Sequence, residues 1–228
     1  MRDRPSPNHD DRRGCAVDMI VIHYTGMESA AVSLDRLCDP DAKVSAHYLI
    51  DEDGAVDRLV TEDRRAWHAG VAFWAGERDV NARSVGIELQ NPGHEFGYRP
   101  FPEPQIAAPT ELAADIAARH AVPPARVVGH ADVAPLRKQD PGELFPWPRL
   151  AALGLGLWPE RWDPSRAVAE ADVPAALARI GYGWLDGPDA DIEAVLRAFQ
   201  RHWRPADPSG RADAETLLRI GNIAPLTR

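Results

Sequence analysis

Apolar segments alternate with polar, loop-forming stretches through the first 150 residues of the chain. The β-branched run 17–23 and the apolar run 84–89 are typical of buried strands. Residues 51–54, Asp-Glu-Asp-Gly, form a turn signal between two further strand patterns, which predicts a hairpin. The expected strands are 17–23, 45–50, 55–60, 84–89 and 127–128.

Helical patterns separate these strands and predict helices at 28–37, 110–120 and 144–153. Residues 92–104, rich in Pro, Gly and aromatic residues, are expected to form a loop. Strands and helices mixed in this order predict an α/β (α+β) fold, in which helices flank a central mixed β-sheet.

The last third of the chain has a different pattern, which predicts a small three-helix domain over 168–228. Its helices are expected at 168–180, 192–202 and 214–220. Residues 156–167 contain Gly, Pro and Trp and are expected to form a linker. At the other end, the polar residues 1–15 predict a flexible tail, so the main domain spans 16–155.

Composition narrows the possible partners and locations. The net charge of −9 argues against a nucleic-acid partner, and the apolar runs are too short for a membrane span. The N-terminus lacks the apolar core of a secretory signal, so we expect a cytoplasmic protein, or a periplasmic one if a signal was removed. Cys15 and Cys38 are too few for a disulfide framework, and we expect free thiols. Oligomeric state is not settled by the sequence, and a monomer is the default expectation.

The loop 129–142 carries the most informative chemistry, because it combines His130, Lys138 and Asp140 directly after a predicted strand. Imidazole and carboxylate groups are good zinc ligands, and a lysine ammonium can stabilise a developing negative charge. His23 ends another predicted strand and supplies a third candidate ligand.

Each of these residues has an ordinary alternative role when taken alone. His23 and His130 could be hydrogen-bonded core histidines, and Asp140 could be a turn residue before Pro-Gly. Together they form a two-histidine, one-aspartate set that leaves the fourth position of zinc open for water. An open position distinguishes a catalytic zinc site from a structural one.

Hydrolysis of an amide also requires a group that moves a proton, and Glu88 is the best candidate. It lies within an apolar strand, where a carboxylate is costly to bury without a partner; alternatively, it faces outward. Lys138 could donate to the oxyanion or be a solvated surface lysine. His47 and His68 could support the ligands or be core residues, whereas His94, His120 and His202 are expected to be exposed.

Five segments in order, 21–25, 45–54, 66–70, 81–89 and 129–142, resemble the zinc-dependent N-acetylmuramoyl-L-alanine amidases of the AmpD/AmiD type. The resemblance covers about residues 16–155 and implies the fold of peptidoglycan-recognition proteins and phage amidases. It implies Zn²⁺ ligands at His23, His130 and Asp140, an acid/base glutamate at Glu88 and an oxyanion lysine at Lys138. It also implies substrate-binding or supporting positions at His47, Trp67, His68, Asn81 and Ala134.

The chain departs from this family's patterns at two places. Phage-type amidases have a tyrosine at the position of Ala46, so Glu88 and Ala46 together indicate the AmpD/AmiD branch. Recycling enzymes of the AmpD kind have an arginine at the position of Asp79, and here the neighbouring Arg78 is the candidate replacement. The C-terminal segments 177–182, 194–202 and 214–218 resemble a peptidoglycan-binding domain; the alternative is a helical cap that only stabilises the protein.

The resemblance implies hydrolysis of the lactyl–L-Ala amide of (1,6-anhydro)muropeptides during peptidoglycan recycling. Peptidoglycan fragments are therefore the expected partners. An envelope amidase that acts on sacculus fragments, or an inactive peptidoglycan sensor, is the alternative. The sensor is disfavoured because all three ligands, the glutamate and the lysine are present. A purely structural zinc site is disfavoured because only three ligands are visible in the sequence.

Overall fold

The computed structural model describes residues 1–227 and centres on a six-stranded sheet. Its strands are β1 Arg2–Asp3, β3 Met19–Tyr24, β4 Tyr48–Ile50, β5 Val56–Arg58, β7 Ser84–Leu89 and β8 Val127–Gly129. Their spatial order is β1-β5-β4-β7-β3-β8. The strands β4, β7, β3 and β8 run parallel, and β5 is antiparallel to β4, so the predicted mixed sheet is confirmed.

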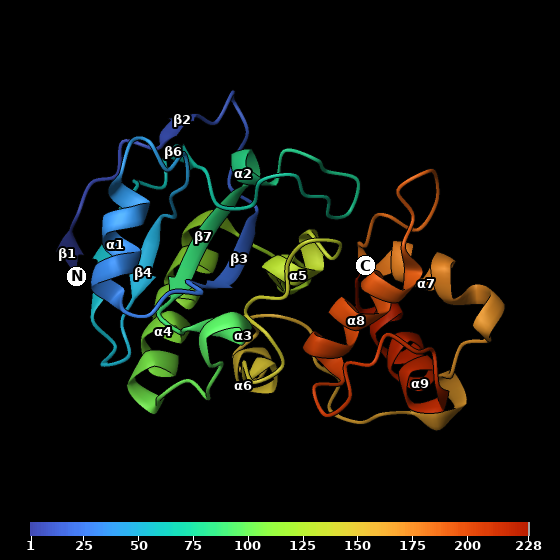
Figure 1. The fold of residues 1–228 in the computed structure, drawn as a ribbon. Helices are drawn as coiled ribbons and strands as arrows, with labels where there is room; N and C mark the ends of the chain where they lie inside the picture. The colour runs from blue at the N-terminus through green and yellow to red at the C-terminus, as the bar shows by residue number, and fades with distance from the viewer. Residues whose placement is uncertain (228) are drawn as a thin grey trace.

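Helices cover both faces of this sheet (Figure 1). They are α1 Ala30–Cys38, α2 Val80–Arg83, α3 Gly93–Phe96, α4 Glu103–His120, α5 His130–Val133 and α6 Trp147–Ala151. In β4, Leu49 packs in a cluster with residues of α1, whereas Ile50 packs in a cluster with residues of α4. Successive residues of a strand point to opposite faces, so α1 and α4 lie on opposite sides of the sheet.

The two central strands have one apolar face and one face that builds the functional site. Val85, Ile87 and Leu89 of β7 pack toward α4, together with Ile20 and Ile22 of β3. The alternate residues of β7, Ser84, Gly86 and Glu88, therefore lie on the opposite face. His23 pairs in register with Glu88 across β3 and β7. The sheet itself thus brings a candidate ligand and a candidate acid/base group to the same face.

The N-terminal segment 1–15 is ordered by pairing, and the prediction of a flexible tail is wrong. Strand β1 pairs with β5 at the sheet edge, and β2 His9–Asp11 pairs with β6 Arg64–Ala66, a strand that we did not predict. The side chain of Arg12 is buried and donates to backbone carbonyls of Glu62, Ala82 and Ser84. These partners are far away in the sequence, so a local polar pattern does not reveal them.

Helix boundaries also differ from the prediction, most clearly in α4. This helix begins at Glu103, within the expected loop 92–104, and continues through Pro109. Pro104 stands in the first helical turn, where no intrahelical N–H bond is required, so it does not prevent an early start. The expected loop also contains α3, the loop 129–142 contains α5, and the helix expected at 144–153 is only α6.

The C-terminal part contains the three predicted helices, α7 Val173–Ile180, α8 Ile192–Trp203 and α9 Ala214–Ile223. They lie beside α5 and α6 (Figure 1) and share one hydrophobic cluster with the sheet. From the sheet this cluster includes Met19, Val21 and Val128, and from the helices Leu177, Phe199 and Ile220. We call residues 168–227 the helical module; it is packed against the sheet-containing part by a continuous core.

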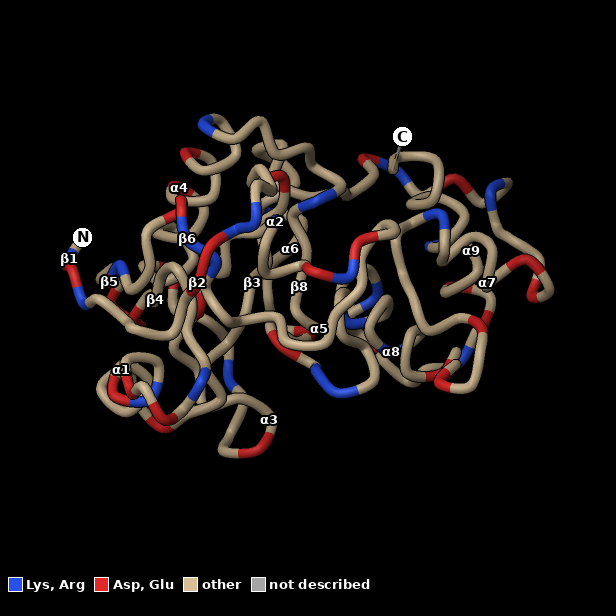
Figure 2. Tube along the Cα trace, turned by 90° about the horizontal axis from the view of Figure 1, so that it is seen from above, with Lys and Arg blue, Asp and Glu red and all other residues tan. Residues whose placement is uncertain are grey.

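Charged residues of both signs are distributed along the whole trace (Figure 2). Within residues 1–227, none of the helices combines the length and apolarity that crossing a membrane requires. Cys15 and Cys38 are free thiols, and both are half-buried.

Candidate metal centre and active site

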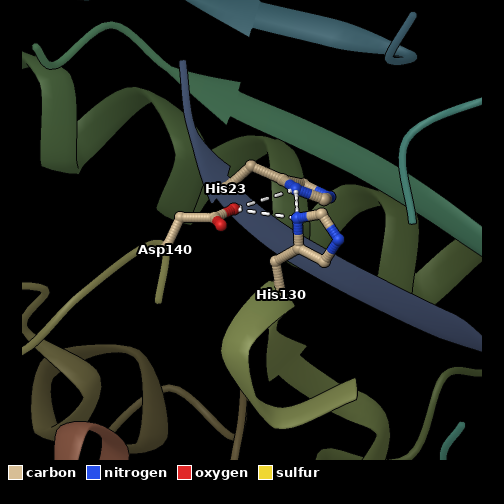
Figure 3. Close-up of side chains that lie close together, drawn as sticks. All are labelled: His23, His130 and Asp140. Atoms are coloured by element: carbon tan, nitrogen blue, oxygen red, sulfur yellow. Dashed lines mark hydrogen bonds and ion pairs between the residues drawn. The ribbon is translucent and has the colours of Figure 1, made fainter. Parts of the chain in front are cut away.

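Three side chains from separate elements converge at the end of the sheet (Figure 3). His23 is in β3, His130 begins α5, and Asp140 lies in the loop that follows α5. The Nδ1 atoms of the two histidines are 2.9 Å apart, and Asp140 Oδ2 is 3.2 Å from Nδ1 of His23 and 3.0 Å from Nδ1 of His130. All three residues are buried.

Hydrogen bonds define which nitrogen of His23 carries the proton. The Ser84 hydroxyl donates to the Val80 carbonyl at 2.6 Å, so it accepts from Nε2 of His68 at 3.1 Å. His68 Nδ1 then accepts from Nε2 of His23 at 3.0 Å. Burial lowers the pKa of His23 to about 4, with His130 acting in the same direction, so its ring is neutral at pH 7. The Nδ1 atom of His23 therefore presents a lone pair to the other two ligands.

His130 is oriented in the same way by the backbone. Its Nε2–H donates to the Ala69 carbonyl at 3.1 Å, so Nδ1 is the nitrogen that faces His23 and Asp140. Arg137 donates to the same carbonyl and to that of Val71 and thereby fixes this loop. Metal-binding histidines commonly donate their second N–H in this manner.

The donor set fits a metal ion. Two imidazole nitrogens and a carboxylate oxygen, each a potential metal ligand, face one another, and a cation among them would be held by all three. A tetrahedral site with bonds of about 2.1 Å separates ligand atoms by about 3.4 Å, and the observed separations of 2.9 to 3.2 Å are close to this value. Three protein ligands also leave one tetrahedral position open.

Glu88 faces the same site from β7 and lines the cleft beside it. Its side chain is buried, and Oε2 has no hydrogen-bond partner. Burial raises the pKa of Glu88 to about 8, and the negative charge of Asp140 acts in the same direction. A carboxyl group with a pKa near neutrality and a free oxygen is suited to accept and return a proton.

Lys138 also lines the cleft and lies in the loop between α5 and Asp140. The Ala134 carbonyl accepts hydrogen bonds from the backbone N–H groups of Arg137 and Lys138, which forms the turn that carries Lys138. The cleft has a volume of about 380 Å³ and is also lined by His68, His130 and Asp140. The structure thus brings the three candidate ligands, Glu88 and Lys138 to one cleft.

The supporting residues proposed from the sequence lie around the site in different roles. His47 directly precedes β4, is buried, and accepts a hydrogen bond from the Gly86 N–H at 2.9 Å. Asn81 Oδ1 accepts from the backbone N–H groups of His68 and Ala69, at 3.1 and 2.7 Å, and so fixes the loop that orients both histidine ligands. Trp67 is half-buried beside this loop, and its backbone N–H donates to the Ser45 hydroxyl.

Sequence analysis missed several residues of the cleft wall, among them Tyr24 and His94. His94 was expected to be exposed, but it is half-buried, with Nδ1 2.9 Å from the Tyr24 hydroxyl and Nε2 3.1 Å from Glu143. Its position in the segment that follows the end of β7, five residues after Leu89, is the signal that could have indicated it. Asp79, where the sequence departs from the AmpD pattern, and the neighbouring Arg78 make other contacts. Asp79 forms an ion pair with Arg65, and the Arg78 guanidinium lies 5.5 Å from the centroid of the Phe73 ring.

The fold and the site together define a hydrolase with a buried group of side chains that could hold a metal ion. The sequence profile of the N-acetylmuramoyl-L-alanine amidases matches residues 13–143. The chain belongs to this family, and it is an amide hydrolase.

Individual relatives support the assignment over nearly the whole chain. N-acetylmuramoyl-L-alanine amidase AmiD of Escherichia coli K12 is 39% identical over an alignment of 224 positions, and the match covers 88% of this chain and 79% of AmiD. The solved AmiD complex with the substrate anhydro-N-acetylmuramic acid-L-Ala-D-gamma-Glu-L-Lys has a TM-score of 0.81 at 37% identity and covers 96% of this chain and 91% of AmiD. AmpDh3 of Pseudomonas aeruginosa, solved with anhydromuramic pentapeptide, has a TM-score of 0.82 at 33% identity, over 95% of this chain and 93% of AmpDh3.

A shorter match is found with 1,6-anhydro-N-acetylmuramyl-L-alanine amidase AmpD of Salmonella typhimurium SL1344. It is 35% identical over an alignment of 171 positions, and the match covers 65% of this chain and 87% of AmpD. The structural likeness to AmiD and AmpDh3, at 95 to 96% of this chain, therefore includes most of the helical module.

Proposed function

We propose that this protein is a zinc-dependent amidase that hydrolyses the amide between the lactyl group of N-acetylmuramic acid and L-alanine. Its proposed substrates are 1,6-anhydro-muropeptides, as in peptidoglycan recycling. The solved complexes of AmiD and AmpDh3 with anhydromuramic peptides support this substrate class.

One observation carries the proposal: three converging ligand atoms, from His23, His130 and Asp140, lie at the same cleft as Glu88, whose Oε2 has no partner. The ligand set favours zinc, because two imidazoles and one carboxylate with an open position are typical of catalytic zinc sites. When bound, zinc polarises a carbonyl and lowers the pKa of a water molecule toward neutrality.

The residues of the chain supply the remaining chemistry. Glu88 accepts a proton from the water that attacks the lactyl carbonyl and delivers it to the L-alanine nitrogen as the C–N bond breaks. Lys138 donates hydrogen bonds to the oxyanion that forms on the former carbonyl oxygen. The products are the free stem peptide, with an amino terminus on L-alanine, and the sugar with a lactyl carboxylate.

Product analysis tests this function directly. The purified chain is incubated with 1,6-anhydro-N-acetylmuramyl-tripeptide and, in parallel, with intact sacculi, each with and without a zinc chelator, and the products are identified by mass spectrometry. We expect chelator-sensitive release of tripeptide from the small substrate and slow release from sacculi. Faster release from sacculi would favour the envelope amidase, and no cleavage by zinc-loaded protein would favour the sensor.

The metal itself is identified by elemental analysis of protein purified without added metal. We expect about one zinc per chain and less than a tenth of that amount in the double variant His23→Ala/His130→Ala. Iron or manganese in place of zinc would overturn the zinc assignment and leave the ligand set intact.

Two predictions remain proposals that need their own experiments. Fractionation of native cells, with marker enzymes for each compartment, tests the cytoplasmic location; recovery from the periplasm would contradict the recycling role. Co-sedimentation of the full chain with sacculi tests peptidoglycan binding by the helical module. Binding that survives the removal of zinc and the blocking of the cleft would support a separate binding surface.

A further inference from the structure

A buried carboxylate, Asp132, connects the helical module to the loop that carries two candidate ligands. Its Oδ1 accepts a hydrogen bond from the Tyr182 hydroxyl at 2.5 Å. Its Oδ2 accepts from Nδ1 of His202 at 2.7 Å and from the backbone N–H of Gly129 at 2.8 Å. Asp132, Tyr182 and His202 are each at most 2% exposed. Two of the three donors to this carboxylate therefore come from the helical module.

Both side-chain donors are rigidly held. The His202 ring is stacked between Trp147 of α6 and Trp203 of α8, with centroid distances of 3.8 and 3.7 Å and interplanar angles of 15° and 6°. The Tyr182 ring meets the Trp74 ring edge-on at 5.1 Å. Because the donors are rigid, they fix the position of the Asp132 carboxylate.

The position of Asp132 in turn determines the geometry of the ligand loop. Its bond to the Gly129 N–H closes the first turn of α5, which begins with the ligand His130. The next residue, Ala131, donates its N–H to the backbone carbonyl of the ligand Asp140 at 2.8 Å. The loop is also tightly packed, since a Cβ at Gly129 would lie 2.7 Å from Cδ of Pro141. A shift of Asp132 therefore moves both ligands.

We propose that Tyr182 and His202 are positioning residues for the metal ligands and act on His130 and Asp140 through Asp132. In this view the helical module is part of the metal site, whatever else it binds. Loss of either donor leaves a buried carboxylate with unmet hydrogen-bonding capacity, so the carboxylate moves and loosens the turn at Gly129. The inference rests on the metal site proposed above.

The variant Tyr182→Phe tests the inference, because it removes one hydroxyl and keeps the packed ring. Metal-stripped full-length protein is titrated with zinc in competition with a chromophoric chelator, and the free energy of unfolding of the metal-free protein is measured by urea. We expect the zinc Kd to rise about 10-fold, as is typical when a group that supports a ligand is lost. His202→Phe, which keeps a ring between the two tryptophans but removes the donor, should raise the Kd similarly.

Thr216→Val is the matched control. The Thr216 hydroxyl is buried in the helical module and accepts from Gln200 and Arg204, without contact to Asp132. We expect this variant to lower the stability of the metal-free protein and to keep the wild-type zinc Kd. A zinc Kd that is unchanged in Tyr182→Phe and His202→Phe, or raised equally in Thr216→Val, would overturn the inference. A wild-type chain that binds no zinc would instead overturn the metal site itself.

Discussion

At the scale of single residues, Glu88 combines two properties that are rarely found together in a strand. It is buried on a sheet face, and one of its carboxyl oxygens has no hydrogen-bond partner. An unpartnered buried polar atom is costly, so its retention indicates a use. The raised pKa, about 8, places both protonation states within reach at neutral pH. Glu88 can therefore act as a base and then as an acid in one turnover.

The variant Glu88→Gln keeps the size of the side chain and removes its ability to exchange a proton. We expect kcat on the anhydro-muropeptide to fall by about 1000-fold, within the usual range for loss of an acid/base group. Zinc content should stay at the wild-type level, because Glu88 is outside the ligand set. Activity within 10-fold of wild type would show that another group moves the proton.

The buried His47 makes stability depend on pH in a defined direction. Burial, with help from the Arg12 charge, lowers the pKa of His47 to about 3, below the unfolded value of about 6.5. The unfolded chain therefore binds the extra proton between these values, so this contribution to stability is complete above pH 6.5 and is lost as the pH falls. The loss amounts to about 1.4 kcal/mol per pH unit.

Urea unfolding of metal-free protein between pH 6.5 and pH 4.5 measures this contribution. We expect the free energy of unfolding of His47→Gln to fall less steeply with decreasing pH than that of wild type, by about 1.4 kcal/mol per unit. Equal slopes for the two proteins would mean that His47 takes up its proton over the same pH range in the folded and unfolded states, and would contradict the lowered pKa.

Residue roles were predictable where the chemistry is local and not where it depends on distant packing. His23 and Glu88 stand out because polar groups interrupt apolar strands, and the loop 129–142 places His130, Lys138 and Asp140 close together in the sequence. His202 was expected to be exposed, yet it is buried between two tryptophans. Its spacing from Ala198 and Phe199 does place it on the apolar face of α8, a signal that was available.

At the scale of elements, the parallel pairing of β3 and β7 positions the site. The register sets His23 opposite Glu88, and the glycine two residues earlier in β7, Gly86, leaves room for the His68 ring. The strands were predictable from their apolar runs, whereas β1, β2 and β6 were not, because short polar strands form only when a partner pairs with them.

The variant Gly86→Ala tests how tightly the register of β3 and β7 is coupled to the hydrogen bonds that link His23, His68 and Ser84. A Cβ at this position would lie 2.5 Å from Cγ of His68, a buried ring held by hydrogen bonds to His23 and Ser84. We expect a loss of about 1–3 kcal/mol in the free energy of unfolding, as is usual for overpacking, and a weaker affinity for zinc. In a His68→Ala background the same substitution should cost less, because the ring is absent. Equal costs in both backgrounds would locate the strain elsewhere.

At the scale of the whole molecule, one hydrophobic cluster crosses from the sheet into the helical module. The Ala75 N–H also donates to the Gly181 carbonyl at 2.8 Å, and a Cβ at Gly181 would lie 2.7 Å from the Trp74 ring. Such close packing couples the stability of the two parts. The sequence indicated a linker and a separate module but could not show this shared core, since the core is built from residues far apart in the chain.

We therefore expect the full chain to unfold in a single cooperative transition. Zinc at about 100 times its Kd should add about 2.7 kcal/mol of stability, which raises the Tm by about 5–10 °C for a chain of this size. Calorimetry with and without chelator, together with tryptophan fluorescence and far-UV circular dichroism, measures both effects. Two resolved transitions, with only one of them sensitive to the chelator, would show that the parts are independent.

The hydrogen bonds from Tyr182 and His202 to Asp132 have a consequence for the exchange of modules between relatives. A helical module taken from another amidase brings its own residues to the places of Tyr182 and His202, and these must match the carboxylate and the tryptophans that receive them. A chimera that keeps every ligand and the whole cleft can therefore still assemble a defective centre. Recombination at residues 156–167 is therefore constrained by side chains outside that segment, Asp132 before it and Tyr182 and His202 after it.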